Sequence, residues 1–226
     1  MLGSLLAAAS VTVVETREDP VDPFLFPEEA DVVARAVDKR RREFATVRQC
    51  ARAALAELGV PAVPILPGPK GAPRWPDGII GSMTHCAGYR AAVVARSSAV
   101  TSIGVDAEPA APLADEGVLA LVADEGERTA LAGLGARHPD VPWDRLLFSA
   151  KESVYKTWFP LTGRWLGFED ARLDLDPDGT FTAALRVPGP TVAGRELKGF
   201  RGTWLIRDGI AVTAIVLPLT SPAPGT

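Results

Sequence analysis

The sequence repeats one order of elements twice, with helices first and strands afterwards. Helical patterns from residue 27 and over 40–58 precede strand patterns over 79–84, 91–96 and 101–108. Helical patterns over 118–134 and 144–159 then precede strand patterns over 171–176, 180–187, 200–207 and 210–217. A loop over 109–117 separates the two blocks. This order favours an α+β fold built from a duplicated unit, with halves 1–110 and 111–226, although the halves share too little sequence to define a repeat.

Individual residues predict where the helices begin and end. Pro27 is typical of a first helical position, and Gly59 is typical of the position after a helix. Asp144 is expected to cap the helix over 144–159, and Pro160 is expected to lie just past its end. Residues 61–78 are rich in Pro and Gly, so they are expected to form an extended loop. Asp-Gly pairs at 178–179 and 208–209 predict tight hairpin turns.

Composition excludes several classes of protein. The chain is 47% hydrophobic and 23% charged, which excludes general disorder, and no stretch reaches about 18 uncharged apolar residues, so no membrane span is expected. Because no Lys or Arg precedes Arg17, the first fourteen residues are expected to form a buried helical turn and a strand rather than a signal peptide. The tail from Pro218 is expected to be frayed. With only Cys50 and Cys86 and a net charge of −4, the chain is expected to be cytoplasmic and not to bind nucleic acid.

The charged residues are segregated along the chain. Residues 35–52 contain seven basic side chains against two acidic ones, and residues 104–127 contain seven acidic side chains and no Lys or Arg. Such a chain can bind a phosphate with one segment and a cation with the other, although two solvated faces are the alternative. Arg48 lies at the edge of the apolar arc of the helix over 40–58. Arg40 projects into the middle of that arc, where a guanidinium needs a frayed helix start or an anionic partner.

Residues 103–108, Ile-Gly-Val-Asp-Ala-Glu, alternate with the period of a β-strand. Their odd-numbered apolar members should face one side, and Gly104, Asp106 and Glu108 the other. The two carboxylates would then lie about 7 Å apart along the strand, with Gly104 leaving room beside them. Such a pair can ligate one hard cation such as Mg²⁺ together with phosphate oxygens of a substrate. A solvent-facing strand end is the structural alternative.

Two further motifs contain residues suited to phosphate chemistry. In residues 148–156, Phe-Ser-Ala-Lys-Glu-Ser-Val-Tyr-Lys, Glu152 and Lys156 share one helix face. This spacing usually makes a surface salt bridge, but beside the acidic strand it can supply a metal ligand and a cation for a leaving phosphate. Thr84 and His85 follow a strand and could hold a phosphate, whereas a half-buried histidine bonded to backbone is the alternative. The sequence contains neither a Walker loop nor a G-x-G-x-x-G motif.

Together, G-S-M-T-H at 81–85, I-G-V-D-A-E at 103–108 and F-S-A-K-E-S-V-Y-K at 148–156 resemble the 4′-phosphopantetheinyl transferase superfamily. The closer resemblance is to the branch typified by enterobactin synthase component D and the enzymes that activate polyketide and non-ribosomal peptide synthases. The likeness covers residues from about 20 to 170 and extends to R-R-R-E-F-A-T-V-R-Q-C-A-R, P-G-P-K-G, W-P-D-G and W-F-P-L-T-G-R-W-L-G-F-E-D. Each motif alone is weak, but their ordered combination is specific.

The resemblance implies a pseudo-dimer of two similar halves with the active site in the cleft between them. It implies transfer of 4′-phosphopantetheine from coenzyme A to a carrier-protein serine, with release of 3′,5′-ADP. Mg²⁺, or Mn²⁺ in its place, would be ligated by Asp106, Glu108 and Glu152, and Ala107 would lend a backbone carbonyl or a water-mediated contact. The residues implied to bind coenzyme A are Arg40, Arg48, Lys70, Thr84, His85, Asp106, Lys151, Glu152, Lys156 and Leu166. The sequence departs from the family in having one lysine in the loop at Lys70 and Thr rather than Ser before His85.

The catalytic residues implied are Glu152, as the base for the attacking serine, and Lys156, as the cation for the leaving phosphate. The expected partners are apo acyl or peptidyl carrier proteins of polyketide, non-ribosomal peptide or fatty acid synthesis. They are expected to dock on a monomer near Arg164 and Trp165, with the Arg41 and Arg42 end of the basic helix as the alternative surface. Trp158 is expected in the core. Two alternatives are a non-catalytic binding module of the same fold and a metal-dependent phosphohydrolase. The presence of all three carboxylates disfavours the first, and the basic helix disfavours the second.

Overall fold

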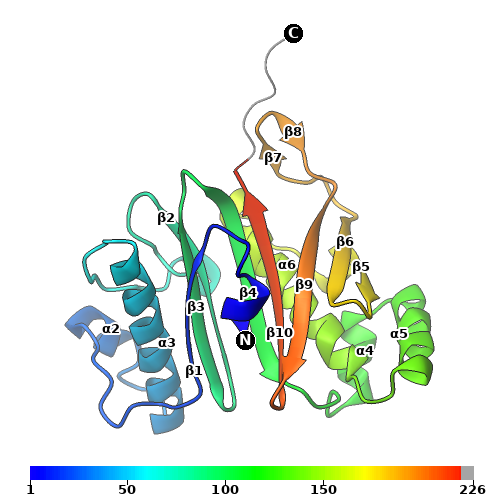
Figure 1. Ribbon diagram of the computed structural model, residues 1–226, viewed down its shortest axis with the longest axis horizontal. Coiled ribbons are helices and arrows are strands. Elements are labelled where there is room, and N and C mark those ends of the chain that lie inside the picture. Colours follow the sequence, from blue (N-terminus) through cyan, green and yellow to red (C-terminus); the bar gives the residue numbers. More distant parts are fainter. Residues whose placement is uncertain (220–226) are drawn as a thin grey trace.

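The computed structural model describes residues 1–219, apart from the side chain of Glu116. Two sheets lie side by side, and each is covered on one face by a long helix (Figure 1). The elements of the first block are α1 (Leu2–Leu5), β1 (Thr12–Thr16), α2 (Pro27–Val32), α3 (Asp38–Glu57), η1 (Pro69–Gly71), β2 (Ile79–Cys86), β3 (Tyr89–Arg96) and β4 (Val100–Pro109). The predicted order of a helix-first block is confirmed here.

The second block also places its long helix before its sheet strands, although no strand among its described residues corresponds to β1. Its members are α4 (Glu116–Val122), α5 (Glu125–Arg137), α6 (Trp143–Thr162), η2 (Phe168–Asp170), β5 (Ala171–Asp176), β6 (Thr180–Leu185), β7 (Thr191–Val192), β8 (Arg195–Glu196), β9 (Gly199–Arg207) and β10 (Ile210–Pro218). The predicted α+β fold of two halves is therefore confirmed. The short β7–β8 hairpin was not predicted from the sequence.

The first sheet has the order β1-β3-β2, and both strand pairs are antiparallel. Its central strand is buried on both faces, because side chains alternate along a strand. Ala91 and Val93 of β3 point into the core between the two sheets, whereas Ala92 and Val94 pack against α3. Of the apolar arc predicted for α3, Ala51, Ala54 and Leu55 are buried in the second of these cores, and the half-buried Leu58 packs against it. Phe44 and Val47 are buried too, but they line a cavity.

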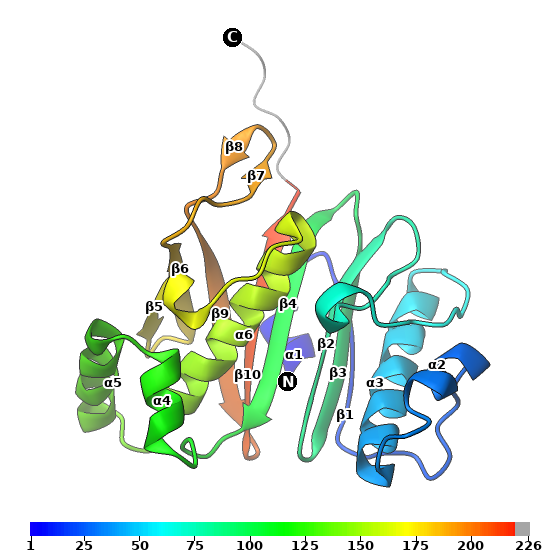
Figure 2. The same ribbon diagram turned by 180° about the vertical axis from the view of Figure 1, so that it is seen from behind.

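The second sheet has the order β4-β10-β9-β6-β5. α6 lies across one face of this sheet, and the short α1 lies on its other side, as the view from behind makes clear (Figure 2). β4 belongs to this sheet because it pairs with β10, which places Asp106 opposite Thr213. The hydrogen-bonded sheets therefore divide the chain before β4, whereas the boundary expected from the sequence follows it.

The helix expected over 118–134 is two helices, α4 and α5. The chain is extended at Ala123, with φ −116° and ψ 131°. Asp124 then begins a reciprocal cap: its Oδ1 accepts from the N–H of Glu127, and Glu127 Oε2 accepts from the N–H of Asp124. The prediction of a single helix was therefore wrong. Because Asp is a favoured N-cap residue and Glu127 follows it by three positions, the sequence itself predicts a helix start at Asp124.

α6 is longer than expected at both ends. It begins at Trp143 with Pro142 in the capping position, so the prediction of Asp144 as the N-cap was wrong. Asp144 instead accepts from the N–H of Leu113 and ties the inter-block loop to the helix. Pro160 lies inside the last turn, and the helix ends only where Gly163 adopts a left-handed φ of 63°.

Several local predictions are confirmed. α2 begins at Pro27, and the first fourteen residues form α1 and the start of β1, with Leu2 fully buried. Asp208 and Gly209 both adopt positive φ, as a two-residue hairpin turn requires. β10 continues to Pro218, and the rest of the expected frayed tail, 220–226, lies outside the described residues. No helix within residues 1–219 is both long and apolar enough to cross a membrane.

Candidate active site

A cavity of about 880 Å³ is lined by residues of both α3 and α6. Its remaining walls come from the loop around Lys70 and from β2 and β4. The basic side chains in its lining are Arg40, Arg48, Lys70, His85 and Lys156, and Glu152 is the acidic one among the described residues. The basic helix α3 and the helix α6, which carries Glu152 and Lys156, are far apart in the sequence but line one cavity.

The carboxylates of β4 bind side chains that lie one helical turn apart on α6. Ser149 Oγ donates to Asp106 Oδ2 at 2.9 Å, and Arg145 Nη1 donates to Glu108 Oε2 at 3.1 Å. Two strand residues span about 6.6–6.8 Å and four helical residues span about 6 Å, so residues two apart on β4 match residues four apart on α6. Both carboxylates point toward α6, in agreement with the alternation of residues 103–108.

The space beside Gly104 is filled, although the sequence suggested that this glycine leaves room for a ligand. A Cβ atom at Gly104 would overlap the carbonyl oxygen of Ser153 and would lie 2.8 Å from the backbone nitrogen of Thr157. The glycine thus allows α6 to pack directly on the strand. This close approach brings Lys156 Nζ within 3.1 Å of the carbonyl oxygen of Val105.

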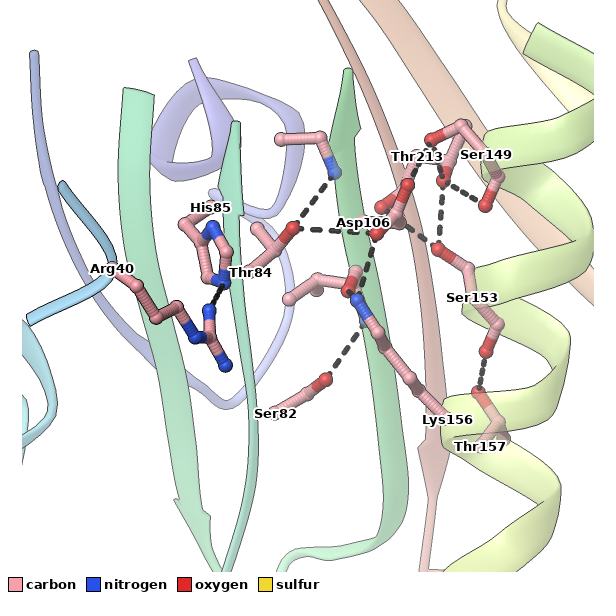
Figure 3. Close-up of polar contacts among 12 residues, drawn as sticks. Arg40, Ser82, Thr84, His85, Asp106, Ser149, Ser153, Lys156, Thr157 and Thr213 are labelled. Carbon is pink, nitrogen blue, oxygen red and sulfur yellow. Dashed lines mark hydrogen bonds and ion pairs between the residues drawn. The ribbon is translucent and has the colours of Figure 1, made fainter. Parts of the chain in front are cut away.

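The carboxylate of Asp106 is held on three sides (Figure 3). Lys156 Nζ donates to its Oδ1 at 2.7 Å, and the hydroxyl of Thr84 lies 3.3 Å from the same oxygen. Ser149 binds the other oxygen, and Asp106 is only 6% exposed. Asp106 is therefore fixed in one orientation, with one cation beside it.

Two hydroxyl groups of β2 join the two sheets. The N–H of Val105 donates to Ser82 Oγ at 3.1 Å, and the N–H of Ala107 donates to Thr84 Oγ1 at 2.9 Å. These side chains satisfy backbone donors on the edge of β4 that faces the first sheet, which pairs with no strand there. Thr84 is 3% exposed, so its hydroxyl is used inside the protein, next to Asp106.

Glu152 lies where the large cavity meets a smaller pocket of about 130 Å³. Within residues 1–219 its carboxylate makes no hydrogen bond or ion pair. Burial raises the pKa of Glu152, the positive charge of Lys156 lowers it, and the negative charge of Asp106 raises it further. A partly buried carboxylate without a protein partner is suited to take up a proton or to ligate a cation.

The expected metal ligands are hard oxygen donors, but they do not form a closed cage. In the described part of the chain, no group of three or more His, Cys, Asp or Glu side chains is gathered closely enough to enclose a metal. Burial raises the pKa of Glu108, and the charge of Asp106 raises it further, so the two carboxylates interact. Mg²⁺ needs only one or two carboxylates when substrate phosphates and waters complete its shell. The donor set, with the unpartnered Glu152 beside it, therefore fits this ion.

The basic residues of the cavity differ in burial. Arg40 is exposed rather than turned into the apolar arc, and its Nη1 lies 2.6 Å from His85 Nε2. Arg48 is 5% exposed; its Nε donates to the carbonyl oxygen of Ile65 and lies 3.8 Å from Glu29. Lys70 adopts a left-handed φ of 54° in the loop. Arg40 and Lys70 are thus the more accessible cations, His85 is half-buried, and Arg48 is anchored in the wall.

Lys151 and Leu166 line the smaller pocket rather than the large cavity. Lys151 is 4% exposed, and its Nζ donates to Glu127 Oε2 at 2.9 Å and to the carbonyl oxygen of Phe168 at 2.8 Å. Burial lowers the pKa of Lys151, and Glu127 opposes this shift. Lys151 therefore links α5, α6 and the segment that carries Leu166.

Sequence reasoning missed the residues that hold these groups in place. Ser149 lies inside a quoted motif, yet its bond to Asp106 depends on how α6 crosses β4. Glu127 could have been found as the third residue after the capping Asp124. Glu29 is fully buried and binds Arg52, a contact between two helices that no local signal reveals.

Comparison with known proteins identifies the family of the chain. The family model of the 4′-phosphopantetheinyl transferase N-terminal domain matches residues 28–95, and that of the 4′-phosphopantetheinyl transferase superfamily matches residues 102–205. The chain is 60% identical over 220 residues to 4′-phosphopantetheinyl transferase Svp of Streptomyces mobaraensis, covering 96% of this chain and 89% of that protein. It is 48% identical over 227 residues to 4′-phosphopantetheinyl transferase PptT of Mycobacterium tuberculosis, covering 96% and 98%. Enterobactin synthase component D of Salmonella typhi is 40% identical over 121 residues, covering 53% of this chain and 49% of that protein.

The two-half α+β fold, with acidic and basic side chains around one cavity, defines a phosphoryl-group transferase. The chain belongs to the 4′-phosphopantetheinyl transferase superfamily, and the predicted resemblance is confirmed. It is an enzyme of the kind that transfers phosphopantetheine from coenzyme A to carrier proteins.

Proposed function

We propose that the large cavity binds the phosphates of coenzyme A and that a carrier-protein serine attacks beside Asp106. One observation carries this assignment: Lys156 lines the cavity, binds Asp106, and shares α6 with the unpartnered Glu152. Coenzyme A brings about four negative charges at neutral pH, which need clustered cations in a chain of net charge −4. The residues proposed to hold its phosphates are Arg40, Arg48, Lys70, His85 and Lys156.

The transfer forms a bond between the serine oxygen and the β-phosphorus of coenzyme A and breaks the bond from that phosphorus to the bridging oxygen. 3′,5′-ADP leaves. Glu152 takes the serine proton, because its raised pKa suits a general base near neutral pH. Lys156 Nζ stabilises the charge that develops on the leaving phosphate. Thr84 contributes through Asp106, whose orientation it helps to fix.

Mg²⁺, or Mn²⁺ in its place, would be held by Asp106, Glu108 and Glu152, with the backbone carbonyl of Ala107 close by. Bound there, the ion supplies positive charge to the pyrophosphate. Ser149 and Thr84 keep the Asp106 carboxylate in one orientation.

The smaller pocket is proposed to take the pantetheine arm. Its walls combine the apolar Leu166 and Phe168 with the ammonium group of Lys151. An ammonium group has three donors, of which Lys151 uses two inside the protein. The third can donate to an amide carbonyl of the pantetheine arm, which would be the role of Lys151 in coenzyme A binding. Leu166 would contact the apolar part of the arm.

The proposed partners are apo acyl or peptidyl carrier proteins of polyketide, non-ribosomal peptide or fatty acid synthesis, and the proposed setting is the cytoplasm. Every residue assigned above belongs to one chain, so we propose that a monomer is active. Sedimentation analysis at assay concentration tests the monomer, and a dimer as the active species would contradict it.

The deciding experiment mixes the protein with coenzyme A, Mg²⁺ and an apo carrier protein and follows carrier mass. Transfer adds about 340 Da, the covalent phosphopantetheine group. A binding module would give no mass gain, and a phosphohydrolase would cleave coenzyme A without modifying the carrier. Asp106→Asn keeps the side-chain shape and should slow transfer at least about 100-fold. Asp174→Asn, on an exposed residue of β5, is the matched control and should transfer normally.

A further inference from the structure

The carboxylate of Glu43 lies behind the ring of His85, inside the wall of the cavity. Its Oε2 is 3.6 Å from His85 Nδ1, and its Oε1 is 3.6 Å from Nη2 of Arg90. Glu43 is only 8% exposed, although it lies on the strongly basic first turns of α3. A buried carboxylate needs such partners, because an unpaired charge away from water is costly. The position of Glu43 is therefore set by Arg90 and His85.

Arg90 is an anchor for this carboxylate rather than a ligand of the cavity. It is 5% exposed; its Nη2 donates to Asp19 at 2.8 Å, and its Nη1 donates to the carbonyl oxygens of Cys86 and Tyr89. Four acceptors from three segments thus surround one guanidinium group. Arg90 is held on β3 and holds Glu43 against His85.

The opposite nitrogen of His85 faces the cavity. Arg40 Nη1 lies 2.6 Å from His85 Nε2, and Arg40 comes from the exposed first turn of α3 (Figure 3). A guanidinium group can only donate, so Nε2 accepts here and the ring proton lies on Nδ1, facing Glu43. His85 therefore lies between the buried carboxylate of Glu43 and the exposed guanidinium group of Arg40.

The charges around His85 act in opposite directions on its protonation. Burial lowers the pKa of His85, and the positive charges of Arg40, Lys156 and Arg90 lower it further. Among the charged groups that face the ring in the described part of the chain, Glu43 is the one that raises this pKa. Because burial and three positive charges oppose protonation of the His85 ring, the negative charge of Glu43 is needed for the ring to accept a second proton.

We propose that Glu43 is a positioning residue, which turns His85 Nε2 toward the cavity and supports its cationic form when a phosphate of coenzyme A binds there. Arg40 then turns from the ring to the same phosphate, because the protonated Nε2 no longer accepts its bond. The inference rests on the proposed phosphate site of coenzyme A. It assigns to Glu43, a buried acidic residue of a basic helix, a role that depends on its negative charge.

The test is the variant Glu43→Gln, which keeps the shape of the side chain and removes its charge. The chain contains two histidines, so the ring signals of His85 can be titrated by NMR with His138 as an internal control. We expect the His85 midpoint to fall in the variant and the His138 midpoint to stay. We also expect KM for coenzyme A at neutral pH to rise about five- to tenfold, at the low end of coupling between linked groups, with kcat little changed. The difference in KM should shrink as pH falls, because His85 is then protonated in both proteins.

Two further variants keep the test decisive if Glu43→Gln loses stability. Glu43→Asp keeps the charge on a shorter side chain, and its His85 midpoint should lie closer to that of the wild type. Glu57→Gln removes an exposed carboxylate from the last residue of the same helix and should change neither quantity. An unchanged His85 midpoint in Glu43→Gln, or an equal loss of kcat and gain in KM at every pH, would overturn the inference. If the wild type fails to bind coenzyme A, the proposed function fails instead, and the ring titration still decides the role of Glu43.

Discussion

A Cβ atom at Gly104 would overlap the carbonyl oxygen of Ser153, so β4 and α6 are in direct backbone contact at the centre of the site. This contact sets the distance from the Asp106 strand to the Lys156 helix. Any side chain at position 104 must push the two elements apart. The glycine is needed here for close approach and not for an unusual backbone conformation.

Gly104→Ala is therefore expected to destabilise the protein and to impair transfer. Overpacking costs about 1–3 kcal/mol, and the clashing atom here is a backbone oxygen, which cannot rotate away as a side chain could. For a chain of this size each kcal/mol lowers Tm by about 2–4 °C. Gly133→Ala, on an exposed site of α5 with open space around it, is the control and should leave Tm unchanged or raise it. Equal melting temperatures for Gly104→Ala and the wild type would contradict the close contact.

Glu152→Gln should stabilise the protein while it abolishes transfer. Burial raises the pKa of Glu152, so between its ordinary and its raised pKa the folded protein binds a proton that the unfolded chain has released. The contribution of this group to the free energy of unfolding therefore falls as pH rises through the range between these two pKa values. We expect a gain of about 0.5–2 kcal/mol at pH 7, measured by urea unfolding without metal or coenzyme A. The gain should vanish as pH falls toward 4.5, and a constant gain at all pH values would contradict this origin.

Lys151→Met should cost about 3–5 kcal/mol, because it leaves Glu127 buried without its cation. Adding Glu127→Gln removes the unpaired charge, so the double variant should be more stable than Lys151→Met alone. Lys198→Met breaks an exposed ion pair with Glu196 and serves as the control, with no measurable loss expected. Chemical unfolding of the wild type, Lys151→Met, Glu127→Gln, the double variant and the control checks this, and additive losses would show that Lys151 and Glu127 are not coupled.

Arg164→Glu should raise KM for the carrier protein and leave coenzyme A affinity unchanged. The structure places Trp158 in the core at 1% exposure and Trp165 on the surface at 67%. Arg164 is also exposed, and its Nη2 donates to the carbonyl oxygen of Pro188. Reversal of its charge should repel a partner with an acidic helix. Arg207→Glu, at the exposed end of β9, is the control with an equal change in net charge. Steady-state kinetics decide this, and a parallel change in both affinities would exclude Arg164 from the docking surface.

The sequence alone determined the order of most elements and the direction in which the carboxylates of β4 point. Alternation over residues 103–108 placed Asp106 and Glu108 on one face of β4, and their bonds to Ser149 and Arg145 of α6 agree. Caps and breakers also located most element ends, because they act on backbone groups within a few residues. The break at Asp124 was equally local and could have been predicted.

Only the tertiary structure decided which residue each charged group meets. The family resemblance placed Lys151 among the residues that bind coenzyme A, yet its ammonium group binds Glu127 of α5 and the carbonyl oxygen of Phe168. It gave Glu43 no role, because nothing local reveals that His85 of β2 lies 3.6 Å away. It also suggested empty space at Gly104, where α6 passes. Local periodicity sets which way a side chain points along its own element, but the partner is set by how distant elements pack, and that depends on contacts spread over the whole chain.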